Sequence, residues 1–352
     1  MKQILRQCVG IDCGKDDLAV SFKTMDNEHD SKLVASKTFR NDKSGFTALI
    51  NWSKKLRQKD MKTSFVIEAT GVYHESVALF LHTQKEEISV ILPNKIKNFA
   101  GTESIKTVND KISSQTIAQF GLEKKLVLWE PPHEVYNYLR QLTRERGQLI
   151  DEQVLVGNQL HAEKAGAWPN KGSIKRMEKR LKLIDQQKEE ILKEIQSLVK
   201  ATDFLKEKVD HICTIKGIGL LTAVTVIAET NGFNLITNKK QLVSYAGLDV
   251  QYKDSGTSVH KKPKISKKGN KHLRKAVYFP ALAAIRGDDK MKGLFVRLVS
   301  KHGIKKKAAI AVQRKLLELI YTLWKNNGDF DPNYNSNKKV RAATGAALKE
   351  IA

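Results

Sequence analysis

The chain has 352 residues, of which 41% are hydrophobic, enough to build the cores of about two domains and to exclude a wholly disordered protein. Its 62 Lys and Arg against 38 Asp and Glu give a net charge of +24. An excess of this size repels itself in a compact state, so it predicts a polyanionic partner such as nucleic acid. The alternative is that surplus lysines only keep the protein soluble, but the basic residues are clustered, which favours the polyanion.

The cysteines and the apolar runs indicate the cellular compartment of the protein. Cys8, Cys13 and Cys213 form neither a disulfide framework nor a CxxC zinc pair, so we expect buried thiols in a reducing compartment. The N-terminal residues lack a signal-peptide pattern, and the most apolar run, 218–228, is too short to span a bilayer. The sequence therefore predicts a soluble cytoplasmic protein with no membrane partner.

Residues 1–130 alternate β-rich runs with helical patterns. The predicted strands and helices follow in chain order: strands at 8–14, 18–24 and 37–40, a helix at 43–58, a strand at 64–71, a helix at 73–83, a strand at 88–94 and a helix at 110–120. A β-hairpin followed by β-α-β-α order predicts an α/β domain with a mixed sheet flanked by helices, as in ribonuclease-H-like proteins.

Residues 131–208 are charge-rich and helical after the Pro131–Pro132 break. Apolar residues recur every three to four positions over 133–164, and again after a break at 165–173, where Ser173 is the predicted N-cap. Two long amphipathic helices joined by a short loop predict an antiparallel hairpin or a dimerising coiled coil. A polar connector packed on its own domain explains the pattern equally well.

Residues 209–330 predict a second globular, mainly helical part, followed by a loosely ordered polar tail at 331–352. An apolar helix reaches residue 230, a segment at 242–248 and a basic loop at about 251–272 follow, and helices are expected at 272–286 and 305–326. Lys216, Gly217 and Gly219 precede the apolar helix as in a helix-hairpin-helix turn, whose backbone N–H groups approach DNA phosphate. An ordinary turn between helices remains the alternative.

Three carboxylates stand at the ends of predicted elements. Asp12 lies on the first strand, Glu68 ends a later strand, and Asp110 opens a helix. An acid on a buried strand is costly unless it is paired or holds a metal, and converging acids supply the oxygen ligands that Mg²⁺ requires for phosphoryl transfer. Singly, each acid is better explained as a cap or an ion-pair partner, whereas the combination in this element order favours a metal site.

The segment 251–275 combines basic residues with hydroxyls. Between residues 260 and 275, eight of sixteen are Lys or Arg with no acid among them. The candidates for phosphate contact there are Lys261, Lys262, Lys264, Ser266, Lys267, Lys268, Lys271 and Arg274. Ser255, Ser258 or Ser266 could attack a phosphodiester while the cations stabilise the transition state, or could only donate hydrogen bonds. The residues alone do not decide between these roles.

Several motifs together resemble a known family. They are VGIDCGKDDLAVS, FVIEATGVYHESVALFL, KTVNDKISSQTIAQFG, ICTIKGIGLLTAVTVIAETNGF, LVSYAGLDV, SGTSVHKKPKISKKGNKHLRKA and AVQRKLLELIYTLWK. In this order and spacing, over residues 7–330, the chain resembles the DEDD-type transposases of insertion-sequence family 110, which include pilin-gene invertases.

The resemblance implies a RuvC-like catalytic domain at 1–130, a coiled-coil insert at 131–208 and a C-terminal transposase domain at 209–330. It also implies that Asp12, Glu68 and Asp110 are acids of a Mg²⁺ or Mn²⁺ site, and that Ser255 is the nucleophile that joins a DNA 5′ phosphate. The expected partners are donor and target DNA, a structured bridge RNA that pairs with both, and further copies of the chain in a dimer or tetramer. Such a protein is bacterial, cytoplasmic and nucleoid-associated.

One position departs from the family pattern. The fourth acid of the family is Ser113 in this chain, and serine is a neutral, weak metal ligand. The departure predicts weaker metal binding, or a substitute ligand such as water, a DNA phosphate, or Asp16 or Asp17, which are close in sequence. Two rival functions remain: a RuvC-like nuclease in which water is the nucleophile and Ser255 only binds phosphate, and a nucleic-acid-binding regulator in which Ser113 marks a decayed catalytic site.

Overall fold

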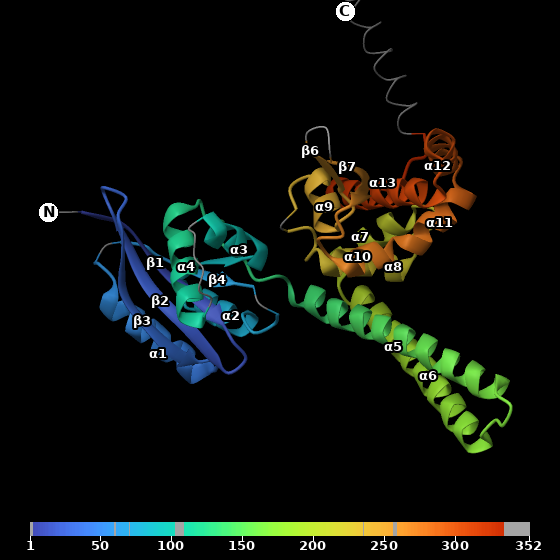
Figure 1. Ribbon diagram of the computed structural model, residues 1–352, viewed down its shortest axis with the longest axis horizontal. Helices are drawn as coiled ribbons and strands as arrows, with labels where there is room; N and C mark the ends of the chain where they lie inside the picture. The colour runs from blue at the N-terminus through green and yellow to red at the C-terminus, as the bar shows by residue number, and fades with distance from the viewer. Residues whose placement is uncertain are drawn as a thin grey trace, which may run out of the picture. The chain divides into compact units, whose positions relative to one another are not determined.

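The computed structural model describes residues 3–59, 61–69, 71–102, 109–234, 236–255 and 259–333, with the backbone alone at 252–255 and 259–262. The chain forms two compact units, Met1–Pro131 and Pro132–Ala352. Figure 1 shows the first unit as a sheet with helices and the second as a long helical hairpin continuous with a helical body. The second unit thus contains both the predicted insert and the predicted C-terminal part.

The first unit is built on a five-stranded sheet in the order β3-β2-β1-β4-β5. Its strands are β1 (Ile4–Cys13), β2 (Asp17–Asp26), β3 (Ser31–Arg40), β4 (Thr63–Glu68) and β5 (Glu87–Ile91). β2 is antiparallel to β1 and β3, whereas β4 is parallel to β1 and β5. This mixed sheet, a hairpin followed by parallel strands, is the ribonuclease-H-like arrangement and confirms the predicted α/β class.

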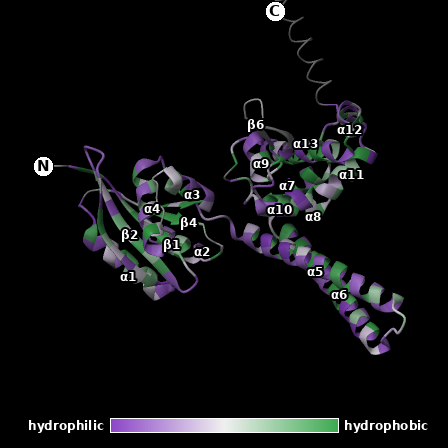
Figure 2. Cartoon of the chain, in the orientation of Figure 1, coloured by the Kyte–Doolittle hydropathy of each residue, from purple (hydrophilic) through white to green (hydrophobic). Residues whose placement is uncertain are grey.

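Four helices accompany this sheet: α1 (Lys43–Leu56), α2 (Glu75–Thr83), α3 (Pro93–Thr102) and α4 (Asp110–Glu123). The sequence did not predict α3, because its only buried apolar side chains are Ile96 and Phe99. Residues on the two faces of the strands belong to separate cores, as period-two alternation requires. Figure 2 shows apolar residues along β1 and β4.

Helix α4 approaches β1 unusually closely because two glycines lie at the contact. A Cβ on Gly10 would come within 2.3 Å of the Ala118 nitrogen, and one on Gly121 within 2.4 Å of the Cys8 sulfur. Since residue 121 meets Cys8 whereas residue 118 meets Gly10, α4 runs antiparallel to β1. The beginning of α4 therefore lies toward the Asp12 end of the strand.

The second unit begins with the helical hairpin α5 (Glu134–Ala165) and α6 (Lys171–Lys200). Figure 2 shows apolar residues repeating between polar ones along both helices, as expected when each buries one stripe. The predicted N-cap Ser173 is wrong: the helix begins earlier, and Asn170 is the cap, accepting a hydrogen bond from the Ser173 backbone N–H at 3.0 Å. The hairpin is confirmed, whereas the coiled coil between chains stays a prediction.

The helical body contains α7 (Asp203–Cys213), α8 (Leu220–Glu229), α9 (Lys239–Tyr245), α10 (Lys271–Ala276), α11 (Tyr278–Gly287), α12 (Asp289–His302) and α13 (Lys305–Asn326). Its apolar core also includes residues from the start of α5, such as Leu139. The sequence did not predict α12, whose only buried side chain is Met291. The predicted basic loop is wrong in part, because β6 (Val250–Ser255) and β7 (Val259–Ile265) pair there as an antiparallel hairpin.

The structure also bears on the expectations for the cysteines and for membrane-spanning helices. Cys8 and Cys13 are buried, and Cys213 is half-buried, with all three thiols free. Within the described ranges, no helix has the length and apolar character needed to cross a membrane. Residues 334–352, most of the predicted polar tail, lie outside the described residues.

Candidate active site and nucleic-acid surface

Asp12 and Glu68 lie side by side at the carboxyl ends of parallel strands. Ile11 pairs with Ile67 across β1 and β4, so the next positions along the two strands are these acids. Alternation assigns their faces: Cys8 and Val66 belong to the core under α4, and Asp12 and Glu68 follow at even spacing. Both acids therefore face the side of the sheet that α4 covers.

Helix α4 brings the third acid to the same end of the sheet. Asn109 caps the helix by accepting the Ile112 N–H at 2.9 Å, so Asp110 is its first residue and Ser113 stands one turn further. The close packing of α4 on β1 fixes this start against Asp12. The Ser113 hydroxyl donates a hydrogen bond to the Asp12 carboxylate.

The electrostatics of Asp12 reflect this convergence. Burial raises its pKa to about 6, and the negative charges of Glu68 and Asp110 act in the same direction. Hydrogen bonds from the Ser113 hydroxyl and the Cys13 backbone N–H offset part of the rise. Burial, followed by the charges of Asp12 and Glu68, likewise raises the pKa of the Cys13 thiol to about 12, which makes it an inert neighbour.

The chemistry of the donor set fits a hard divalent cation, because carboxylates that repel one another are oxygen ligands and a cation would relieve the repulsion. The three carboxylates are spaced more widely than the ligands of an occupied metal site. In the described part of the chain, no group of three or more His, Cys, Asp or Glu side chains is close enough to hold one ion. An ion held by Asp12, Glu68 and Asp110 together would need them closer than they lie in this structure.

Asp16 lies in the turn that joins β1 to β2, and Asp17 is the first residue of β2. Both are exposed, and their backbone carbonyls accept hydrogen bonds from Asn41 and Gly14, at 2.8 and 2.9 Å. Among the described interactions of Asp12, none involves either residue. Ser113, rather than these two acids, is the additional side chain that the structure brings to Asp12.

The predicted nucleophile belongs to the other compact unit. Ser255 is the last residue of β6, and its backbone pairs with Val259 at the start of β7. The side chains of Ser255, Lys261 and Lys262 and all of Ser258 lie outside the described residues. The exposed cations that follow on this hairpin and at the start of α10 are Lys264, Lys267, Lys268 and Lys271. Together they form a basic strip.

Two residues predicted to contact phosphate are engaged within the protein. The Ser266 hydroxyl donates to the Asp249 carboxylate at 2.5 Å, which ties the end of β7 to the residue before β6. The Arg274 guanidinium donates to the carbonyls of Ala246 and Gly269 at 2.8 and 3.2 Å. Both side chains hold the base of the β6–β7 hairpin, and phosphate contact by either stays a prediction.

Residues 214–219 connect α7 to α8 as a tight turn. Gly217 has φ +91°, and a Cβ there would lie 2.9 Å from the Pro280 carbonyl oxygen, so the position needs glycine. Gly219 caps α8, and the Lys216 ammonium donates to the Gly287 carbonyl at 3.2 Å. Two helices joined by this turn fit the helix-hairpin-helix interpretation, and DNA contact at the turn remains a prediction.

A buried acid that the sequence pattern did not single out, Glu229, organises this unit. Glu229 ends the apolar helix α8, and its side chain is 1% exposed. Arg144 of α5 donates to both carboxylate oxygens at 2.7 and 2.9 Å, and the Asn270 amide donates at 2.6 Å. Burial alone would raise the pKa of Glu229, but the bonds from Arg144 and Asn270 hold it below its ordinary value. An acid ending an apolar run was the available signal.

Comparison with known proteins identifies the family. A transposase model of the DEDD IS110 type matches residues 9–163, and a model described as transposase IS116/IS110/IS902 family matches residues 209–295. The pilin gene-inverting protein of Moraxella lacunata is 28% identical over 92% of this chain and 97% of its own length. That of Moraxella bovis is 28% identical over 84% of this chain and 90% of its own.

Among solved structures, RuvC from Thermus thermophilus matches 35% of this chain and 99% of its own, with 10% identity and a TM-score of 0.27. Both family models are transposase models, and together they match residues 9–163 and 209–295, so the chain is a DNA recombinase of the transposase class. It belongs to the IS110 family of transposases.

Proposed function

We propose that this protein cuts and rejoins DNA through Ser255, assisted by a divalent-metal site at Asp12, Glu68 and Asp110. The observation that carries the proposal is the convergence of the three acids at one end of the sheet, where Glu68 and Asp110 add negative potential at Asp12. The cationic β6–β7 hairpin that bears Ser255 supplies the complementary surface for a phosphate backbone.

The reaction is a transesterification. The Ser255 hydroxyl attacks a scissile phosphorus, a bond forms between serine Oγ and the 5′ phosphate, and the DNA 3′ oxygen leaves with a proton. A 3′-hydroxyl of the partner strand then attacks the phosphoserine, restores a phosphodiester and returns the proton to Ser255. The number of phosphodiester bonds is conserved, so no energy source is required.

The protein groups divide the work between the two units. Asp12, Glu68 and Asp110 would hold Mg²⁺ or Mn²⁺, which would stabilise charge on the phosphate oxygens and would lower the pKa of the attacking hydroxyl. As carboxylates they also accept the serine proton. Lys264, Lys267, Lys268 and Lys271 bind the DNA backbone and position the scissile phosphate.

The relatives guide the choice of substrate and partners. The Moraxella relatives are named for inverting a pilin gene, so we propose that this chain likewise recombines two DNA sites. The family resemblance supports a structured bridge RNA that selects those sites, and an oligomer in which several subunits hold both DNAs. The net charge of +24 supports binding of this much nucleic acid.

A covalent-adduct assay tests the proposal. Purified protein, RNA transcribed from the DNA flanking its own gene, Mg²⁺ and end-labelled junction DNA are combined and separated on a denaturing gel. We expect a protein–DNA adduct with wild type and with Ser300→Ala, and none with Ser255→Ala. Ser300→Ala is the matched control because it removes an exposed serine hydroxyl from α12 of the same unit.

The other results would each support a rival. Free cleaved DNA without adduct favours a nuclease that uses water as the nucleophile. Binding without cleavage in Mg²⁺ or Mn²⁺ favours a regulator, for which Ser113 at the fourth-acid position is the supporting observation. A closely related active recombinase run in parallel shows that the assay conditions allow cleavage.

A further inference from the structure

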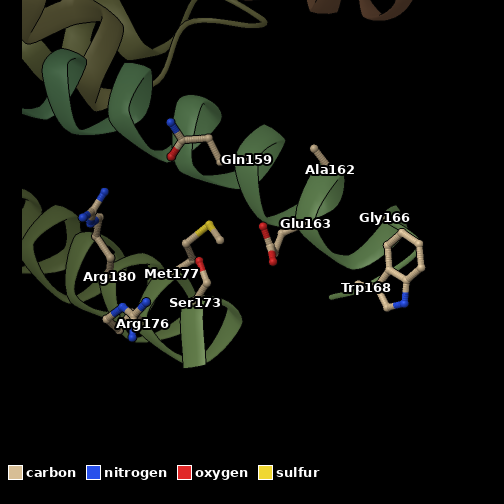
Figure 3. Close-up of a pocket in the computed structure, with 9 residues that line it drawn as sticks. All are labelled: Gln159, Ala162, Glu163, Gly166, Trp168, Ser173, Arg176, Met177 and Arg180. Carbon is tan, nitrogen blue, oxygen red and sulfur yellow. The ribbon is translucent and has the colours of Figure 1, made fainter. Parts of the chain in front are cut away.

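The tip of the α5–α6 hairpin carries an exposed tryptophan beside a hollow. Trp168, in the loop between the helices, is 93% exposed. The hollow, about 610 Å³, is lined among others by Gln159, Glu163, Trp168, Arg176, Met177 and Arg180. Figure 3 shows Trp168 on the loop side of this hollow, with Arg176 and Arg180 on α6.

The hairpin does not need this tryptophan in order to fold. The turn is held by the Asn170 cap of α6 and by the Asn170 N–H, which donates to the Glu163 carboxylate at 2.7 Å. In the part of the chain that the structure describes, neither an aromatic ring nor a cation packs on the Trp168 ring. Exposing a large apolar ring to water costs free energy, and a ligand that covered the ring would remove this cost.

The charge around the ring indicates which ligand. Residues 163–182 contain seven Lys and Arg and two acids. Both acids are engaged, Glu163 with the Asn170 N–H and Glu178 with Lys164 at 2.7 Å. Arg176 and Arg180, four positions apart on one face of α6, are exposed, and the described interactions include no ion pair for either. The tip therefore presents a flat ring and two available guanidinium groups.

Unpaired nucleotides match this combination, since their bases stack on aromatic rings and their phosphates take bidentate bonds from arginine. A protein partner matches less well, because Trp168 is the one large apolar side chain exposed within 163–182 and a protein interface needs a wider apolar patch. Duplex DNA matches less well because its bases are already stacked.

We propose that the hairpin tip binds an unpaired nucleotide of a nucleic-acid strand, with the base stacked on Trp168 and the phosphate held by Arg176 and Arg180. RNA loops and single-stranded DNA share this chemistry. The inference goes beyond the proposed function, because it needs neither the metal site nor Ser255.

Binding measured in the full chain tests the proposal without any strand cleavage, if every protein carries Ser255→Ala. Labelled single-stranded RNA, single-stranded DNA of the same sequence and the matching duplex are titrated at fixed salt. Trp168→Ala should weaken binding of one or both single strands by about 5- to 100-fold, the range expected for one stacked base, and leave the duplex affinity unchanged. Trp168→Phe should restore most of the loss.

A second variant tests the arginines, and a lysine on the same helix serves as its control. Arg180→Gln should weaken single-strand binding and reduce the salt slope by about 0.7, whereas Lys193→Gln, an exposed position nearer the other end of α6, should change both less. If the variants lose affinity for single-stranded RNA alone, the ligand is RNA. If they lose affinity for both single strands, the site does not distinguish RNA from DNA.

The proposal is overturned if Trp168→Ala binds single strands like its parent, or if it loses the same factor on duplex. It is also overturned if gel filtration shows that Trp168→Ala dissociates an oligomer while its affinity for single strands is unchanged, because the tip would then contact a second copy. A failed adduct assay with intact tip binding would count against the serine mechanism alone.

Discussion

At the scale of single residues, Asp12 is a carboxylate whose negative charge the fold opposes. Its neighbours in the structure are two acids and one serine, so its negative charge is opposed by burial and by like charges. A carboxylate whose ionised form destabilises the folded state is a candidate functional residue, because the fold keeps it despite this cost. The cost should be measurable in the free protein and should disappear when a cation or a proton binds.

We predict that Asp12→Asn stabilises the protein at pH 7.5. Because the folded pKa is raised to about 6 from an ordinary 3.8, the native state binds more protons than the unfolded state between these values. The free energy of unfolding therefore falls as pH rises through that window. After discounting for solvent screening, the gain at pH 7.5 should be about 1 kcal/mol and vanish near pH 4.

Urea unfolding of the full chain across pH 4 to 8, without divalent cations, measures this difference. Asp17→Asn is the matched control, because it removes an exposed carboxylate just beyond the same strand. Parallel pH curves for wild type and Asp12→Asn would contradict the prediction.

Ser113 leads to a second prediction at this scale. Ser113→Asp places a carboxylate where a hydroxyl now donates to Asp12, which adds repulsion in the free protein and a ligand for a cation. We expect a lower melting temperature than wild type without metal and a larger rise with Mg²⁺ or Mn²⁺. Thermal melting with and without metal tests this, with Ser113→Asn as the uncharged control; equal rises in all three proteins would argue against a cation at this position.

At the scale of elements, the decisive contact is that of α4 on β1. Gly10 and Gly121 let the helix backbone approach the strand, and this approach fixes the start of α4 against Asp12. The Ser21 hydroxyl reinforces the contact through a 2.8 Å hydrogen bond to Ser114. The proposed metal site would therefore depend on Gly10, Gly121 and Ser21, none of which is a proposed ligand.

We predict that Gly10→Ala destabilises the protein by about 1–3 kcal/mol, because the new Cβ would meet the Ser114 oxygen and the Ala118 nitrogen at 2.3 Å. The displaced helix should also reduce the stabilisation by Mg²⁺. Gly157→Ala is the control, since a Cβ there meets nothing within 4 Å and the helix should gain up to about 1 kcal/mol. Denaturant unfolding with and without Mg²⁺ measures both effects, and equal stability of the two variants would show that α4 can shift freely.

At the scale of the whole molecule, the proposed chemistry is divided between two compact units. The acids lie in Met1–Pro131, and Ser255 lies in Pro132–Ala352. In the second unit, the buried Glu229 joins Arg144 of α5 to Asn270 near the basic strip. The α5–α6 hairpin and the basic strip thus belong to one compact unit. We propose that an oligomer combines the acids of one subunit with the serine of another.

We predict that co-expressed Asp12→Ala and Ser255→Ala subunits together form the covalent adduct, although each variant alone does not. The adduct should form on the Asp12→Ala chain, which keeps the serine, and a size tag on one chain identifies it on the gel. Asp12→Ala with Asp110→Ala is the control, because both acids come from one unit and neither chain then has an intact set. Absence of adduct in the first mixture would mean that each subunit uses its own acids.

The local sequence pattern was sufficient for most elements. Alternating and three-to-four spacings predicted the strands, the hairpin helices and the start of α4, because side-chain periodicity is a local property of the backbone. It failed for α3 and α12, which bury few side chains, and for the β6–β7 hairpin, whose charged residues resemble a loop.

The sequence by itself determined the net charge, most of the strands and helices, the positions of the three acids and the family to which the chain belongs. Only the tertiary structure decided that Ser113 bonds to Asp12, that Arg274 and Ser266 hold the base of the hairpin, and that Arg144 reaches Glu229. The physical reason is separation along the chain. Arg144 and Glu229 are 85 positions apart, and such a contact depends on how elements pack, which local periodicity does not encode.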